Sequence, residues 1–244
     1  MKKIFSVYGI AYLALLVFVF GLQYVYPKLE LHLLLNSYHT SLQDVFFKYY
    51  TMLAEWPLYV LALLPIFWGK IKMTLFFAMC EISGGAILQL LKHTISTERP
   101  VSAFEHYHGV VLPLVQGVDM HHSNSFPSGH ASTFFVFCTC CAIILAYHYK
   151  LKVEQSSISG NQGTGSDVSC AGNQNGKKSF NCVGLYAVLL LLLILAALGA
   201  YSRIYLSQHF LSDVCMGSII GFLTPCLIFY FGRDKLLKLQ NKKG

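Results

Sequence analysis

The stretch Val183–Tyr201 reads VGLYAVLLLLLILAALGAY and carries no charged side chain. An apolar run of about 20 residues is what an α-helix needs to cross the hydrocarbon core of a bilayer. Two polar residues, Ser202 and Arg203, follow the run directly. The stretch therefore predicts a membrane-spanning helix with functional polar groups close to its end.

The whole chain has the composition of a membrane protein. Of its 244 residues, 55% are hydrophobic and 12% are charged, and the mean hydropathy is +0.54. So few charges cannot cover the surface of a soluble globule. We expect one all-α membrane domain over residues 1–244, with six spans at Ile4–Tyr26, Leu53–Gly69, Met73–Leu91, Ala131–Tyr149, Val183–Tyr201 and Val214–Phe231.

The first 50 residues predict two further features. The chain begins Met-Lys-Lys, but its first apolar run is too long for a signal peptide and ends without a small-residue cleavage site, so we expect an uncleaved anchor. The segment Leu29–Tyr50 mixes Leu and Phe with charged and amide side chains. It lacks the continuous apolarity of a span and suits a helix that lies in the membrane interface.

A first charged motif, Lys92-x6-Arg99-Pro100, follows the third span. Lys92 and Arg99 are two helical turns apart, so they share a face if the helix extends that far. Pro100 discourages a helix from continuing through Arg99. These two cations are candidates for holding phosphoryl oxygens.

A second motif, Pro127-Ser128-Gly129-His130, stands just before the fourth span. A capping serine and a glycine leave backbone N–H groups free at a helix N-terminus, which attracts anions. His130 would lie in the first turn, where it could give a proton to a leaving oxygen. The motif therefore predicts a phosphate cradle with an acid beside it.

A third motif, Ser202-Arg203-x5-His209-x3-Asp213, begins at the end of the opening stretch. At i and i+4 on a helix, the Asp213 carboxylate could bond one imidazole nitrogen of His209 and leave the other free to attack phosphorus. Arg203 adds a third cation. Three cations about 5 Å apart would repel by roughly 3 kcal/mol per pair at an effective dielectric near 20, so the site needs an anionic guest.

The distribution of cations predicts the topology. Thirteen of the eighteen lysines and arginines fall in the segments on the same side as the N-terminus, and three of the other five belong to the motifs. By the positive-inside rule that side is cytoplasmic, so we expect all three motifs on the outer, periplasmic face of a multi-pass inner-membrane protein. The net charge of +7 reports this topology and gives no support for nucleic-acid binding.

Three features outside the motifs have simpler interpretations. The Gly-, Ser- and Asn-rich residues 154–181 predict a flexible cytoplasmic loop. Six of the eight cysteines fall within spans, which excludes a secreted disulfide framework. Four histidines of the outer loop could contact a headgroup, or alternatively bind a metal or stay in solvent, namely His106, His108, His121 and His122.

Together the motifs resemble those of the type 2 phosphatidic acid phosphatase superfamily, which also contains the vanadium haloperoxidases. Every signature position is matched between Lys92 and Asp213. The resemblance implies that His209 is the nucleophile and forms a phosphohistidine, that His130 is the general acid, and that Asp213 orients the nucleophile. It further implies no metal or other cofactor, and a phosphoryl-binding set made of Lys92, Arg99, Ser128, Gly129 and Arg203.

We therefore expect a lipid phosphatase whose partner is a phosphorylated membrane lipid that enters from the bilayer. The candidate substrates are lipid A phosphates, polyprenyl pyrophosphates such as undecaprenyl pyrophosphate, phosphatidic acid and phosphatidylglycerol phosphate. The wide outer loop favours a large or multiply phosphorylated headgroup. Two alternatives stay open: a lipid phosphotransferase that uses the same phosphohistidine, and a non-catalytic lipid-binding or transport protein. The oligomeric state does not follow from the sequence.

Overall fold

The computed structural model describes residues 2–107, 110–160 and 182–238. Within these ranges all regular structure is helical, which confirms the all-α prediction. The helices are α1 (Lys2–Val25), α2 (Lys28–Leu35), α3 (Ser41–Met52), α4 (Pro57–Leu63), the 3-10 helix η1 (Leu64–Trp68), α5 (Ile71–Thr94), α6 (Pro100–Glu105), α7 (Gly129–Gly160), α8 (Cys182–Tyr205) and α9 (Leu211–Lys238).

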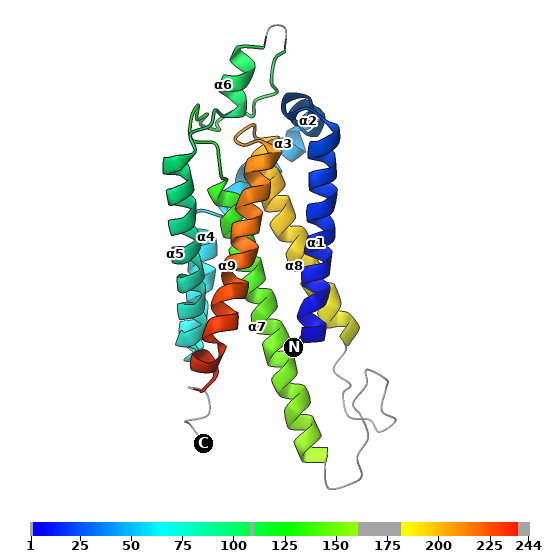
Figure 1. Ribbon diagram of the computed structural model, residues 1–244, viewed down its shortest axis with the longest axis vertical. Helices are drawn as coiled ribbons and strands as arrows, with labels where there is room; N and C mark the ends of the chain where they lie inside the picture. Colours follow the sequence, from blue (N-terminus) through cyan, green and yellow to red (C-terminus); the bar gives the residue numbers. More distant parts are fainter. Residues whose placement is uncertain (1, 108–109, 161–181, 239–244) are drawn as a thin grey trace.

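Five of these helices are long and apolar enough to cross a membrane, namely α1, α5, α7, α8 and α9. Their positions match five of the six spans that the hydropathy of the chain predicts. They run side by side as a bundle, with α6 and the loops around it at one end and the start of α1 and the end of α9 toward the other (Figure 1). The protein is therefore a multi-pass membrane protein.

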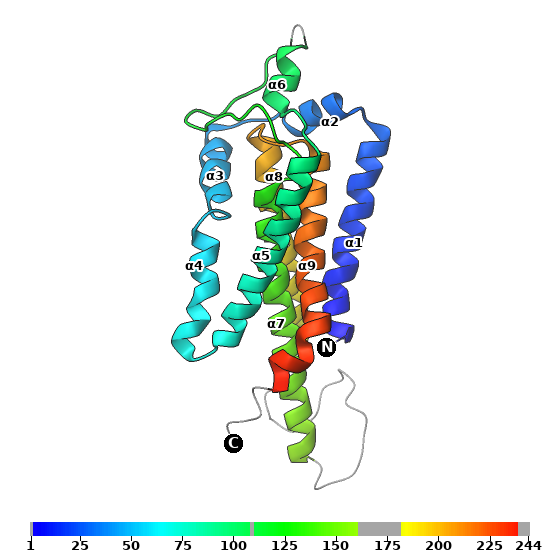
Figure 2. The ribbon, with the colours of Figure 1, turned by 60° about the vertical axis from the view of Figure 1, so that its left-hand side comes forward.

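The remaining predicted span, Leu53–Gly69, is not one helix. Helix α4 begins at Pro57, and because proline has no amide hydrogen, it cannot donate a hydrogen bond to the preceding turn. The 3-10 helix η1 ends at Gly69, which has a left-handed conformation with φ of 67°. Helix α3 stands above α4 and is bent from it by 47° (Figure 2). A sixth span exists only if this bent pair crosses the membrane as a unit.

The segment expected to form one interfacial helix over Leu29–Tyr50 is divided as well. It forms α2 and α3, and the break between them ends at Thr40, whose hydroxyl caps α3 by accepting a bond from the Gln43 amide. Helix α2 lies across the end of the bundle, whereas α3 runs along it (Figure 2). The polar residues of this segment thus belong to two elements.

Helix α7 is the centre of the bundle. In its most apolar window 67% of the residues are buried, against 11% for α1, and it packs against α5, α8 and α9. Contact with α9 is close at Gly217 and Gly221, where an added Cβ would overlap the carbonyl oxygens of Ser128 and Ser132. Small residues four apart allow such approach between membrane helices.

The first residues of the predicted cytoplasmic loop are helical. Helix α7 continues to Gly160, so residues 154–160 are helical. Residues 161–181, which make up the rest of that predicted loop, lie outside the described residues.

Candidate active site

Five helix ends bring the motif residues to one end of the bundle (Figure 1). Lys92 lies near the end of α5, Arg203 near the end of α8, and Asp213 in the first turn of α9. His130 is the second residue of α7 and Arg99 precedes α6. Residues more than a hundred positions apart in the sequence are thereby gathered in one region.

The first motif does not form on one helix. Helix α5 ends at Thr94, and Arg99 has extended backbone, with φ of −85° and ψ of 162°, so the expectation that Lys92 and Arg99 share a helix face is wrong. Arg99 is extended, as expected for a residue that precedes proline, and Pro100 begins the new helix α6. Lys92 and Arg99 still lie within electrostatic range of each other.

Arg99 is buried and held by backbone and amide oxygens. Its Nε donates to the Ser123 carbonyl at 2.9 Å, and its Nη1 donates to both the carbonyl and the side-chain oxygen of Gln208 at 3.1 Å. Burial lowers the pKa of the Arg99 guanidinium, while the nearby Asp213 carboxylate acts in the opposite direction. These contacts hold Arg99 against Gln208, which directly precedes His209 in the sequence.

The second motif forms the start of α7, as predicted. Ser128 is fully buried, its amide donates to the Asp213 carbonyl at 3.0 Å, and its hydroxyl accepts from the Ala131 amide at 3.5 Å. A Cβ placed on Gly129 would meet no atom within 4 Å. There is consequently open space beside the N-terminal turn of α7, where a helix attracts anions.

The third motif is not helical at His209. Helix α8 ends at Tyr205 and α9 begins at Leu211, so the i and i+4 argument on a helix fails. Ser207 adopts a left-handed conformation, with φ of 52°, and its hydroxyl accepts a 2.5 Å bond from the Asn36 amide group. The chain turns back so that the His209 amide donates to the Arg203 carbonyl at 3.1 Å.

His209 and Asp213 nonetheless come together in this turn. Nδ1 of His209 lies 3.8 Å from Oδ2 of Asp213, and the two side chains are 3% and 2% exposed. The distance is that of an ion pair and is too long for a direct hydrogen bond. Burial lowers the pKa of His209 to about 4, although Asp213 acts to raise it. His209 is therefore neutral near pH 7, with Nε2 as the nitrogen that does not face the carboxylate.

Ser125 completes this pair, although it belongs to none of the three motifs. Its hydroxyl donates to Oδ2 of Asp213 at 2.5 Å and lies 3.5 Å from Nδ1 of His209. The Phe210 amide donates to the same carboxylate oxygen at 3.0 Å. Ser125 stands two residues before Pro127 and has no charge, so only its place next to a motif could have drawn attention to it.

Arg203 is the second buried cation of the group. Its Nη1 donates to the Thr51 hydroxyl of α3 at 2.8 Å, whereas its Nε has no hydrogen-bond partner among the described residues. Buried polar atoms of proteins are almost always paired, and a guanidinium offers donors that match phosphate oxygens. Arg203, Arg99 and Lys92 also act on one another electrostatically. The arrangement fits an oxygen-bearing anion.

The outer histidines that the structure describes are His106, His121 and His122. In the described part of the chain, no group of three His, Cys, Asp or Glu side chains could hold a metal ion. His122 contacts the Ser102 hydroxyl at 3.1 Å and the Glu105 carboxylate at 3.7 Å. His108 lies outside the described residues.

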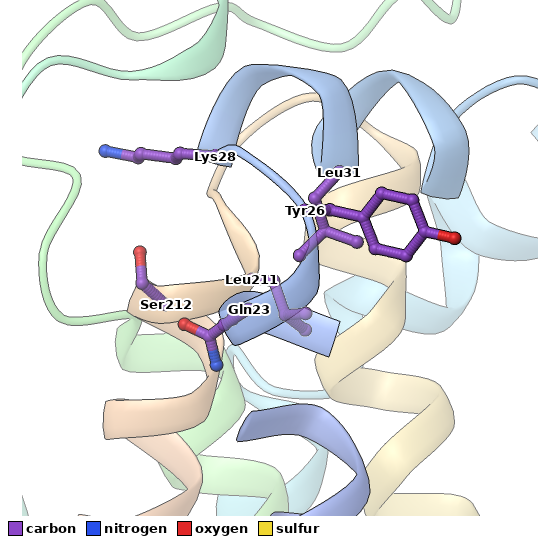
Figure 3. Close-up of a pocket in the computed structure, with 6 residues that line it drawn as sticks. All are labelled: Gln23, Tyr26, Lys28, Leu31, Leu211 and Ser212. Carbon is purple, nitrogen blue, oxygen red and sulfur yellow. The ribbon is translucent and has the colours of Figure 1, made fainter. Parts of the chain in front are cut away.

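A small cavity lies beside the motif residues, between the end of α1, the start of α2 and the start of α9 (Figure 3). Its volume is about 130 Å³, and it is lined by Gln23, Tyr26, Lys28, Leu31, Leu211 and Ser212. The Ser212 hydroxyl donates to Oδ1 of Asp213 at 3.1 Å. The cavity is therefore linked to Asp213 through Ser212, and the motif side chains named above do not line it.

Comparison with known proteins agrees with the motifs. The model of the PAP2 superfamily matches residues 72–236, and no curated protein sequence matches the chain. The crystal structure of Aquifex aeolicus LpxE is similar in fold, with a TM-score of 0.55 and 23% sequence identity over 82% of this chain and 93% of that one. Because the family model covers more than half of the chain, including all three motifs, the chain belongs to the PAP2 superfamily.

Proposed function

We propose that this membrane lipid phosphatase hydrolyses a phosphomonoester or pyrophosphate of a membrane lipid through a phosphohistidine on His209. The observation that carries the proposal is the buried Nε of Arg203, which has no hydrogen-bond partner among the described residues and lies within range of Arg99, Lys92, His130 and His209. A phosphoryl oxygen is the acceptor that such a donor lacks. The phosphoryl group would then lie close to neutral His209, whose Nε2 can attack phosphorus.

In the first step, Nε2 of His209 attacks phosphorus and a nitrogen–phosphorus bond forms. The bond between phosphorus and the lipid oxygen breaks, and His130 gives its proton to that leaving oxygen. Asp213 and Ser125, which face Nδ1 of His209, hold the ring and stabilise the positive charge that it gains. General acid catalysis of this kind contributes about 10²–10⁴-fold.

In the second step, water replaces the histidine. His130, now neutral, takes a proton from the water as it attacks phosphorus, the nitrogen–phosphorus bond breaks, and inorganic phosphate leaves. Both enzyme histidines return to their initial states. The reaction consumes one water and releases one phosphate per lipid.

The cations supply the charge neutralisation that a metal ion supplies in other phosphatases. Arg203 and Arg99 are buried, and Lys92 is partly buried at the end of α5. Preorganised donors in such a site stabilise the charge that develops on the phosphoryl oxygens. We therefore expect full activity in excess EDTA, and loss of activity that one divalent cation restores would contradict a metal-independent mechanism.

The active-site face is proposed to be the periplasmic or outer one, and the membrane the cytoplasmic one. The support is the lysine and arginine distribution of the loops. Val111 lies in the loop at the motif end of the bundle and is 92% exposed. Cells carrying Val111→Cys should therefore bind a membrane-impermeant thiol reagent more strongly than cells with the parent chain, and labelling only after cell lysis would place this face inside.

We infer the substrate class from the family and from the chemistry of the motifs. This chemistry is compatible with lipid A phosphates, polyprenyl pyrophosphates and glycerophospholipid phosphates alike. A phosphotransferase would form the same phosphohistidine but pass the group to a second lipid. A non-catalytic binder needs the cations but has no use for a buried His209–Asp213 pair. We therefore place hydrolysis first.

The test is phosphate release by purified protein in micelles that contain one candidate lipid at a time. Hydrolysis predicts one inorganic phosphate for each lipid consumed, with a protein-bound phosphate that is labile in acid and is not formed by His209→Gln. Transfer of the group to a second lipid without free phosphate would support the phosphotransferase. If the protein binds lipids but converts none of them, the result would support the non-catalytic lipid-binding protein.

A further inference from the structure

The break between α3 and α4 brings a carboxylate to the active site. Residues 53–56 form turns, in which the Ala54 and Glu55 amides donate to the carbonyls of Thr51 and Met52 at 3.1 Å. Thr51, on the last turn of α3, is the residue that holds Nη1 of Arg203. Glu55 follows one turn later and belongs to none of the three motifs.

Glu55 lies against the histidine that is proposed as the proton donor. Its Oε1 atom is 3.8 Å from Nε2 of His130, and the two side chains are 49% and 29% exposed. Glu55 also lies within electrostatic range of Arg203. The end of α3 and the turns that follow it thus reach two motif residues, Arg203 through Thr51 and His130 through Glu55.

The other ionisable side chains that act most strongly on His130 are basic. They come from four different parts of the fold, and they are Lys92 of α5, Arg99 before α6, Arg203 of α8 and His209 of the turn before α9. Positive neighbours disfavour a protonated imidazole, and a carboxylate at close range favours it. Glu55 is the acidic side chain in ion-pair contact with His130.

We propose that Glu55 is a positioning residue for His130, which holds its ring through Nε2 and stabilises the protonated form that acts as general acid. With Nε2 facing Glu55, Nδ1 is the nitrogen that gives its proton to the leaving oxygen as the bond to phosphorus breaks. Glu55 would thus orient His130 and stabilise its positive charge, as Asp213 is proposed to do for His209. This role rests on the proposed function of His130.

Glu55→Gln keeps the shape of the side chain and removes its charge. We expect kcat/KM for an alkyl lipid phosphate to fall about tenfold and the basic limb of its pH profile to move to lower pH by about one unit. A p-nitrophenyl ester needs little help from an acid because its leaving group is stable as an anion, so its kcat/KM should hardly change. Glu55→Asp should restore part of the loss.

Glu105→Gln is the matched control, because Glu105 lies 3.7 Å from His122 in the outer loop and outside the site. It should leave rate and pH profile unchanged. If Glu55→Gln keeps the wild-type rate and profile, or slows alkyl and aryl esters equally with an unmoved limb, the proposed role of Glu55 is wrong. Wild-type protein that releases no phosphate from any lipid would instead contradict the proposed function.

A second readout does not depend on turnover. In protein labelled with ¹⁵N-histidine, the resonances of His130 are identified by their loss in His130→Gln, and their titration midpoint is compared between wild type and Glu55→Gln. We expect the midpoint to fall by about one pH unit in the variant. An equal midpoint in the two proteins would overturn the proposal even if the lipid substrate were still unknown.

Discussion

The Ser125 hydroxyl donates a 2.5 Å hydrogen bond to Oδ2 of Asp213. Because both side chains are buried, this bond fixes the carboxylate that faces Nδ1 of His209. Ser125 lies in the loop before α7 and Asp213 in α9, so the bond also joins two segments on which the site depends. Loss of this hydrogen bond should disturb the orientation of Asp213 and His209 more than it weakens substrate binding.

Ser125→Ala should therefore lower kcat about tenfold and leave KM nearly unchanged. A hydrogen bond to a charged group contributes about 1.5–3 kcal/mol, and about 1.4 kcal/mol corresponds to tenfold in rate. Steady-state phosphate release measures both constants. Ser102→Ala is the control, since that hydroxyl contacts His122 in the outer loop. A Ser125→Ala enzyme with wild-type kcat would show that Asp213 is held well enough by other donors.

His209→Gln should lower phosphate release by at least about 10⁴-fold, because the attacking nitrogen is removed. The side chain is 3% exposed, and glutamine fills much of the same volume, so the protein should stay folded. Size-exclusion chromatography and thermal unfolding in detergent check the fold beside the rate. Substantial turnover by a folded His209→Gln protein would require another nucleophile.

Stability should fall in acid because of a buried histidine that the mechanism does not use. Burial lowers the pKa of His32 to about 4 from an ordinary value of 6.5. Between those two pH values the unfolded chain binds more protons than the folded one, so the free energy of unfolding rises with pH across this window, by up to about 1.4 kcal/mol per pH unit. Above pH 6.5 this contribution is constant.

The check is thermal unfolding of wild type and His32→Phe from pH 4 to 7. Phenylalanine suits the site, because the His32 ring packs against Phe104 and Phe210 and its Nδ1 has no hydrogen-bond partner among the described residues. The variant should lose less stability in acid than wild type does. His122→Gln, which changes an exposed side chain, should behave like wild type; equal slopes in all three proteins would contradict the assignment.

The sequence predicted the long spans and the residues that gather at one end of the bundle better than the local geometry of those residues. Hydropathy finds the five long spans because apolar runs are local signals, and each motif is short enough to recognise alone. His209 lies in a turn because Ser207 is held left-handed by Asn36, 171 positions away, and no local pattern reports such a contact. Glu55 was hidden inside a predicted span that in fact breaks at Pro57.

Gly217→Ala should damage the site without touching a motif residue's side chain. An added Cβ would overlap the Ser128 carbonyl oxygen, which is backbone and cannot turn aside. Helix α7 must then move away from α9, and His130 moves with it relative to Asp213. We expect a loss of about 1–3 kcal/mol in stability together with a fall in kcat/KM. Gly85→Ala is the control, since a Cβ there meets nothing within 4 Å.

Arg203→Lys should be nearly as harmful as Arg203→Ala, although it keeps the charge. The guanidinium bonds Thr51 through Nη1 and still has a free Nε donor among the described residues, and a single ammonium cannot make both contacts from the same position. Loss of one preorganised donor to the reacting group lowers the rate about 10²–10³-fold. Thr51→Val is the matched variant, because it removes the partner of Nη1 and leaves Nε intact. Thr51→Val should lower kcat/KM less than Arg203→Lys does, and it should weaken competitive inhibition by inorganic phosphate less. The reverse order would mean that Arg203 acts through its packing against α3 rather than on the phosphoryl group.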